Sequence, residues 1–173
     1  MKLNLPVTQK EAPFPAGRYV VSKTDLKGDI THVNDVFVEL SGFSRDELLG
    51  KSQNIVRHPD MPPQAFADLW STVQAGRPWR GIVKNRCKNG DHYWVDALVV
   101  PVKQDDAVIG YMSVRTEPAR AQVAAAEALY AGLKEGRAAR AIIPIENSQH
   151  GRVADIHFLL PESGLYIIGE HFL

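Results

Sequence analysis

Arg57, His58 and Asp60 lie within four positions in the stretch SQNIVRHPDMPPQAF, residues 52–66. Such a group could form a metal site, an acid/base centre, an anion clamp or a helix cap. His58 and Asp60 supply at most two nearby metal ligands, and no nucleophile or second carboxylate stands at a supporting spacing. Metal binding and hydrolytic catalysis are therefore disfavoured. Either Asp60 caps the following helix and pairs with Arg57, or the guanidinium contacts an anion.

The composition is that of an ordinary globular protein with one domain and short appendages. The chain has 173 residues, 45% hydrophobic and 23% charged, with 20 basic and 20 acidic side chains. A net charge of zero disfavours a nucleic-acid partner. The first residues carry prolines and charges rather than a signal sequence, and no apolar run approaches the roughly 18 residues of a membrane span. The single cysteine, Cys87, excludes a disulfide framework. We expect a cytoplasmic protein with no membrane span in this chain.

The first half of the chain predicts a hairpin followed by short helices. Residues 17–33 have strand character around a turn at Lys27 to Asp29. Two short helices follow within residues 34–50, and the second has Ser44 as N-cap with Glu47 three positions later. After Met61 and two prolines, apolar residues at helical spacing predict a longer helix, which ends before Gly76.

The second half predicts three long strands and a helix. Asn89-Gly90 marks a two-residue hairpin turn, and a third strand begins after residues 104–106. The order indicates an α+β fold: a five-stranded antiparallel sheet with short helices over one face, plus a C-terminal helix. We divide the chain into an N-terminal arm (1–18), a central domain (19–117), a helix (118–136) and a tail (137–173) that has no predicted structure.

The strand WRGIVKNRC places an amide on the face that points inward. Alternation predicts that one face carries the more apolar set, which is Trp79, Gly81, Val83, Asn85 and Cys87. Burial of the Asn85 amide without partners would cost a few kcal/mol. Either neighbouring backbone or water satisfies this amide, or it faces a bound ligand.

Residues 19–117 resemble a PAS domain. The carrying motifs are GDITHVNDVFVELSGFSRDELLGK at the start and KNRCKNGDHYWVDALVVPV with IGYMSVRT at the end. The joint occurrence of RHPDMP and GIVKNRCKNGDHYWV makes the domain similar to the FAD-binding sensor of the Aer-type aerotaxis and energy-taxis receptors. This resemblance implies a ligand cleft between the sheet and the helical layer, occupied by FAD.

The resemblance also implies a set of cofactor contacts. Asn85 would face the edge of the flavin ring, Arg57 and His58 would contact the cofactor, and Asp60 would hold the shape of the loop. The implied pocket walls and one further matched position are Phe66, Trp70, Trp79, Tyr93 and Asn34. Aromatic walls suit a planar ring, although each of these aromatic residues alone could be ordinary core.

Adduct-forming photochemistry is disfavoured. Gln53 stands where the cysteine of a blue-light-sensing PAS domain would stand, and Cys87 lies on a different element. Val95 and Met112 are assigned to the positions of the amides that those photosensors aim at the ring. Redox sensing is preferred.

We expect a non-catalytic redox sensor that transmits the oxidation state of FAD to a chemotaxis signalling partner. That partner would be a HAMP and methyl-accepting domain in the same protein or a membrane chemoreceptor bound in trans, and the chain could form a homodimer. The alternative is a ligand-free interaction module that dimerises. Its sign would be Asn85 turned to solvent and a cleft filled by Trp70 and Tyr93. A flavoenzyme is a third possibility, but no second polar cluster serves a substrate.

Overall fold

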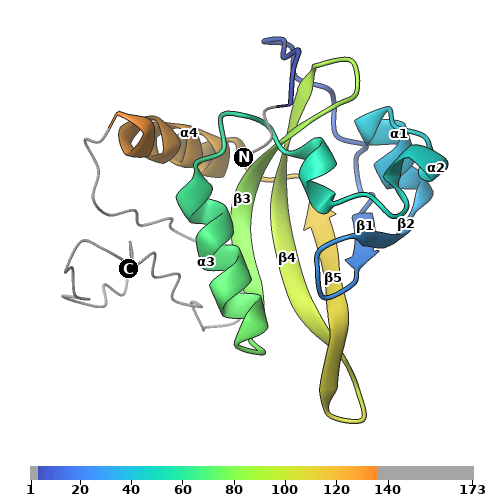
Figure 1. Ribbon diagram of the computed structural model, residues 1–173. Helices are drawn as coiled ribbons and strands as arrows, with labels where there is room; N and C mark the ends of the chain where they lie inside the picture. Colours follow the sequence, from blue (N-terminus) through green and yellow to red (C-terminus); the bar gives the residue numbers. More distant parts are fainter. Residues whose placement is uncertain (1–3, 136–173) are drawn as a thin grey trace, which may run out of the picture.

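Alternating inward and outward side chains build a five-stranded antiparallel sheet of order β2-β1-β5-β4-β3 (Figure 1). The computed structural model describes residues 4–135, so the predicted tail (137–173) lies outside the described residues. The strands are β1 (Val20–Thr24), β2 (Ile30–Val33), β3 (Trp79–Arg86), β4 (His92–Gln104) and β5 (Ala107–Thr116). The predicted α+β fold with a five-stranded antiparallel sheet is confirmed.

Short helical elements between β2 and β3 form a layer on one face of the sheet, which we call the inner face (Figure 1). They are α1 (Asp35–Ser41), α2 (Arg45–Leu48), the 3-10 helix η1 (Gln53–Val56) and α3 (Pro63–Gln74). Ser44 forms the predicted capping box with Glu47 at the start of α2. Gly42 ends α1 in the left-handed region, with φ of 71°, where glycine is favoured.

The start of α3 differs from the alternative in which Asp60 caps this helix. The N-cap position is occupied by Pro62, and no side chain forms a cap hydrogen bond there. A proline at the first helical position removes one of the free N–H groups that a cap would satisfy. The Asp60 carboxylate instead accepts from two lysines.

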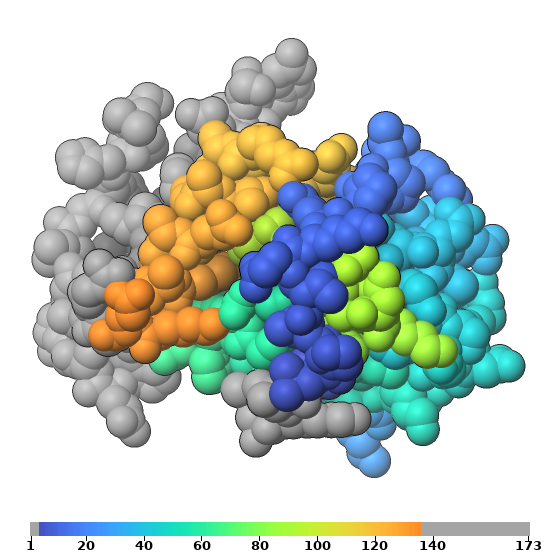
Figure 2. All heavy atoms as spheres, turned by 90° about the horizontal axis from the view of Figure 1, so that it is seen from above, coloured from blue at the N-terminus to red at the C-terminus, as the bar shows by residue number. Residues whose placement is uncertain are grey.

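The outer face of the sheet is covered at its β3–β4 end by the N-terminal arm and by α4 (Arg120–Lys134). The arm hydrogen-bonds with the hairpin, since the Thr8 N–H donates to the Gly90 carbonyl at 2.8 Å and the Ala12 N–H to the His92 carbonyl at 2.7 Å. Figure 2 shows the arm lying between α4 and the hairpin end. The outward-facing residues Ile82, Lys84 and Arg86 of β3 are consequently buried, whereas Arg80 is exposed.

Tyr130 attaches α4 to the sheet. Its hydroxyl donates to the Ile82 carbonyl at 2.5 Å, and its ring stacks on Trp94 with a centroid distance of 6.4 Å. None of the helices in residues 4–135 combines the length and the apolar character that a membrane crossing requires.

Gly110 allows β5 to pack against the turn that follows β1. A Cβ atom at this position would collide with the Thr24 carbonyl oxygen, which is backbone and cannot rotate away. We expect Gly110→Ala to lower the free energy of unfolding by about 1–3 kcal/mol, the usual cost of overpacking. Urea unfolding measures this cost. Ile109→Ala, at a neighbouring exposed side chain, serves as the control; equal effects of the two variants would contradict the argument.

Candidate functional site

A cavity of about 680 Å³, which includes its open mouth, lies between the inner face of the sheet and the layer of η1 and α3. A concave and mostly apolar space with a few polar groups is typical of small-molecule sites. Most of its wall is apolar or aromatic. The lining residues are Ser22, Thr24, Gly28, Gln53, Val56, Arg57, Phe66, Leu69, Trp70, Val73, Trp79, Val83, Asn85, Ala97, Val99, Tyr111, Ser113 and Arg115.

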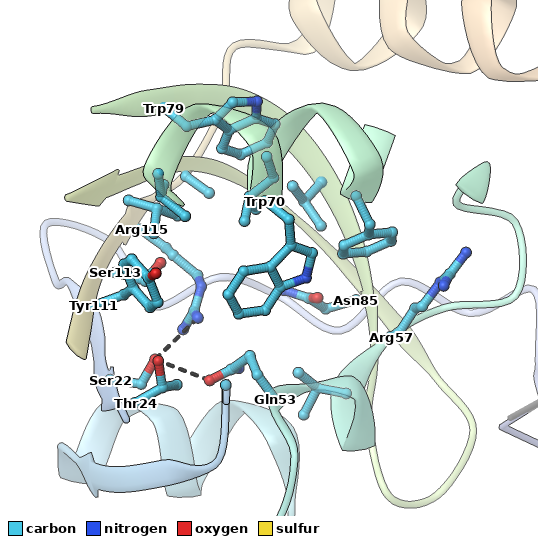
Figure 3. A pocket seen from close by; sticks show the side chains of 18 residues that line it. Ser22, Thr24, Gln53, Arg57, Trp70, Trp79, Asn85, Tyr111, Ser113 and Arg115 are labelled. Carbon is cyan, nitrogen blue, oxygen red and sulfur yellow. Dashed lines mark hydrogen bonds between the residues drawn. The ribbon is translucent and has the colours of Figure 1, made fainter. Parts of the chain in front are cut away.

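Two tryptophans and a tyrosine shape the aromatic wall (Figure 3). Trp70 of α3 meets Tyr111 of β5 edge to face, with ring centroids 5.6 Å apart. The indole N–H of Trp79 donates to Asp68 of α3 at 2.6 Å, which fixes the ring against the helix. Burial raises the pKa of Asp68, and the hydrogen bond from Trp79 opposes that rise.

Gln53, Ser113 and Arg115 give one end of the cavity a polar character (Figure 3). The Ser22 hydroxyl joins two of them, because it accepts from Arg115 Nη2 at 3.0 Å and donates to Gln53 Oε1 at 3.1 Å. Within the described residues, Gln53 Nε2, Ser113 Oγ and Arg115 Nη1 are buried without a hydrogen-bond partner. Buried polar groups are normally paired, so these atoms indicate a polar ligand group at this end.

Of these groups, the charged guanidinium of Arg115 has the highest desolvation cost. The residue is 6% exposed, and its side chain lies over the Phe37 ring at 5.1 Å. No carboxylate in the part of the chain that the structure describes forms an ion pair with it. Burial lowers the pKa of Arg115, because desolvation disfavours the charged form. An electron-rich ligand edge would offset that cost.

Asn85 lies where the alternation of β3 places it. It is 5% exposed and lines the cavity together with Trp79 and Val83 of the same face. The ligand-free alternative predicts Asn85 turned to solvent and a cleft filled by Trp70 and Tyr93. Asn85 is instead buried, and Trp70 but not Tyr93 lines the cavity.

Arg57 lines the cavity, is 7% exposed, and its guanidinium points away from the polar end (Figure 3). The guanidinium lies over Phe66, 4.3 Å from the ring centroid, and donates to the Met61 carbonyl at 2.9 Å. The backbone of Arg57 pairs with that of Asn85 through an isolated antiparallel bridge. Five of the nine residues expected at the site thus line the cavity: Arg57, Phe66, Trp70, Trp79 and Asn85.

His58 and Asp60 lie away from the cavity lining. Asp60 accepts from Lys84 Nζ at 3.0 Å and from Lys134 Nζ at 2.7 Å. Burial opposes ionisation of Asp60, but these hydrogen bonds outweigh it and hold its pKa at about 2. His58 is buried, accepts from the Asp60 N–H at 3.1 Å and meets His92 edge to face.

Asn34 and Tyr93 also lie outside the cavity lining. Asn34 caps α1 and ties it to β1: its Oδ1 accepts from the Phe37 and Val21 N–H groups, and its Nδ2 donates to the Tyr19 carbonyl. Tyr93 points inward, is 1% exposed and packs in the core, where burial raises its pKa.

The polar side chains of β5 are absent from the predicted site. The resemblance implies Met112 at a ring-facing position, whereas Ser113 and Arg115 line the cavity. The signal was present in the alternation of the strand, because Tyr111, Ser113 and Arg115 must share a face. Gln53 enters the prediction only as the residue at the position of the photosensor cysteine, and Ser22 is absent from the predicted site.

Residues 30–115 match the family described as PAS fold. The aerotaxis receptor of Escherichia coli (strain K12) is 51% identical over 136 residues. The chain carries a PAS domain of the aerotaxis-receptor type. The matched segment is 79% of this chain but 27% of that receptor, so the chain spans about a quarter of its length.

The fold of this PAS domain also matches solved structures. The LOV domain of the blue-light-activated histidine kinase from Erythrobacter litoralis EL346 has a TM-score of 0.54 at 18% identity. The match covers 59% of this chain and 97% of that structure. At this identity the similarity supports the fold alone.

A second family match extends beyond the PAS domain. Residues 105–173 match the family described as prephenate dehydratase. The bifunctional N-acyl-homoserine lactone acylase/prephenate dehydratase of Komagataeibacter europaeus is 60% identical over 42 residues, 24% of this chain and 15% of that protein. The family match begins at the end of β4 and includes β5, which is paired in the PAS sheet.

The buried His58 should make the free energy of unfolding depend on pH in the acid range. Burial, helped by the charge of Lys84, lowers its pKa from 6.5 to about 4; His92 and Lys134 act in the same direction, and Asp60 opposes them. Between these values the unfolded chain binds a proton that the folded protein does not, so stability falls as pH falls. The loss should reach up to about 3 kcal/mol. Urea titrations at several pH values give the free energy of unfolding as a function of pH. This pH dependence should be weaker in His58→Asn than in the wild type, and an unchanged pH dependence would contradict the assignment to His58.

Substitution of Asn34 should lower the stability of the fold without directly removing a contact in the cavity. Asn34→Ala removes the α1 cap and the bond to β1, so the free energy of unfolding should fall by about 1–3 kcal/mol. Asn34→Asp keeps the acceptor and should lose less. Thermal unfolding compares the two variants; equal losses would show that the Oδ1 bonds are not what matters.

Proposed function

We propose that this PAS domain is a redox sensor that binds FAD in the cavity and signals its oxidation state for aerotaxis or energy taxis. The observation that carries the proposal is an aromatic cavity whose polar end holds buried polar atoms on Gln53, Ser113 and Arg115 without hydrogen-bond partners among the described residues. A bound flavin supplies reversible electron transfer together with proton uptake at its ring nitrogens.

The residues present fit a flavin ring. Trp70, Trp79 and Tyr111 offer faces and edges to a planar group. Asn85 offers both a donor and an acceptor, and Arg115 and Gln53 add donors at the polar end, which suits a ring edge rich in carbonyl oxygens. The Arg115 charge favours any state of the ligand that carries more electron density at that edge.

The diphosphate of FAD is assigned to the Arg57 side of the cavity, away from the polar end. The Arg57 guanidinium has a planar fork of donors suited to phosphate oxygens. His58 and Asp60 support the loop that carries Arg57 and are assigned no direct contact, and Asn34 and Tyr93 support the cavity from α1 and from the core. No residue is assigned a catalytic role.

The signalling role is supported by the relative as well as by the site. The matched relative is an aerotaxis receptor, although the matched part covers about a quarter of it. We assign to this chain the sensing step in the cytoplasm, with output to a HAMP and methyl-accepting domain in cis or to a membrane chemoreceptor in trans.

The purified protein should show flavin absorbance that dithionite bleaches and air restores. Release of the chromophore and mass spectrometry should identify FAD rather than FMN. A colourless protein that takes up no FAD on reconstitution would overturn the proposal, and release of FMN would correct the cofactor and the role of Arg57.

Substitutions at the polar end should weaken FAD binding. Arg115→Met removes a hydrogen bond from a charged group, worth about 1.5–3 kcal/mol, so the Kd for FAD should rise about ten- to hundredfold. Asn85→Leu should act in the same direction. Gln104→Leu, at an exposed position at the end of β4, is the control. Fluorescence titration with FAD measures the Kd; an unchanged value in Arg115→Met would contradict the assignment of the polar end.

A further inference from the structure

The loop Arg57–Met61 wraps around the edge of the sheet. β3 is the edge strand, and the loop follows it closely. On the inner side Arg57 lines the cavity, and its backbone pairs with that of Asn85. The backbone N–H of Lys84, the preceding residue of β3, donates to the Met61 sulfur at 3.2 Å. The loop therefore belongs to the cavity wall.

On the outer side the same loop holds the end of α4. Asp60 accepts from Lys134, the last residue of α4, at 2.7 Å and from Lys84 of β3 at 3.0 Å. One carboxylate thus joins the loop, the edge strand and the helix. The Lys84 side chain is 9% exposed and the Lys134 side chain is 46% exposed, so the link to the helix is the one that water can replace.

Internal contacts make the loop a single unit. Arg57 Nη2 donates to the Met61 carbonyl at 2.9 Å, and the Asp60 N–H donates to His58 Nδ1 at 3.1 Å. Met61 is 1% exposed and His58 is 2% exposed, which anchors the loop against β3. A displacement of Arg57 at the cavity is consequently transmitted to Asp60 rather than absorbed within the loop.

We propose that the loop Arg57–Met61 couples occupancy of the cavity to docking of α4, with the Asp60–Lys134 ion pair as the link. The identity of the ligand rests on the proposed function. A ligand that moves Arg57 or Asn85 changes the position of the Asp60 carboxylate relative to Lys134. Half-exposed ion pairs are weak, so a small displacement shifts the equilibrium between docked and released α4. By linkage, release of α4 changes ligand affinity by the same factor.

The link itself is tested without a ligand. Hydrogen exchange of the amides in the last turns of α4 should be about two- to fivefold faster in Lys134→Gln and Asp60→Asn than in the wild type. Lys103→Gln, at an exposed lysine of β4 with no ion pair among the described residues, is the matched control and should exchange like the wild type. Equal exchange in Lys134→Gln and Lys103→Gln would overturn the proposal.

The coupling is tested with FAD as the probe. FAD should change α4 exchange in the wild type, and Lys134→Gln should change the Kd for FAD by a matching factor while Lys103→Gln leaves it unchanged. If FAD binds but α4 exchange and the Kd in Lys134→Gln both stay unchanged, the coupling is wrong and the FAD site stands.

A separate experiment tests the coupling if the protein does not bind FAD. If the wild type takes up no FAD, the proposed function fails, and Arg57→Gln tests the coupling from the cavity side. Faster α4 exchange in this variant, with an unchanged circular dichroism spectrum, would support the coupling; unchanged exchange would overturn it. If Arg57→Gln does not fold, Arg57→Lys replaces it, with the same two outcomes.

Discussion

The desolvation of the Arg115 guanidinium is the constraint on which the cavity depends. Among residues 4–135 no carboxylate pairs with this buried cation, so its burial costs free energy, and the Ser22 hydroxyl and the Phe37 ring compensate only in part. Since β5 is the central strand, the charge cannot move to solvent without disruption of the sheet. The cavity end is therefore preorganised for an electron-rich group.

The edge strand β3 contributes side chains to two different environments, the cavity on its inner face and the contacts with α4 on its outer face. Its inner face carries Trp79, Val83 and Asn85 in the cavity wall. Its outer face carries Ile82 and Lys84, which contact α4 directly or through Asp60. Because side chains alternate along a strand, neighbouring residues point to opposite sides of the sheet. This arrangement brings side chains of the cavity wall and contacts to α4 within one peptide unit of each other.

The sequence predicted the elements better than it predicted the site. Period-two alternation placed Asn85 inward, and the Ser44–Glu47 spacing predicted the capping box, because both are local patterns. The positions of His58 and Asp60 depend on how the loop Arg57–Met61 turns around β3, which no local pattern encodes. Arg115 is absent from the predicted site, although it stands two residues after Ser113 and alternation places both side chains on the same face of β5.

The three tryptophans of the chain divide between the two sides of the sheet. Trp70 and Trp79 line the cavity, while Trp94 lies on the outer face, stacked against Tyr130 of α4. A planar chromophore in the cavity would quench the emission of the first two by energy transfer. Trp94 would respond to the departure of the tyrosine ring and the arrival of water. The protein thus contains two intrinsic optical probes, one for occupancy and one for helix position, that need no added label.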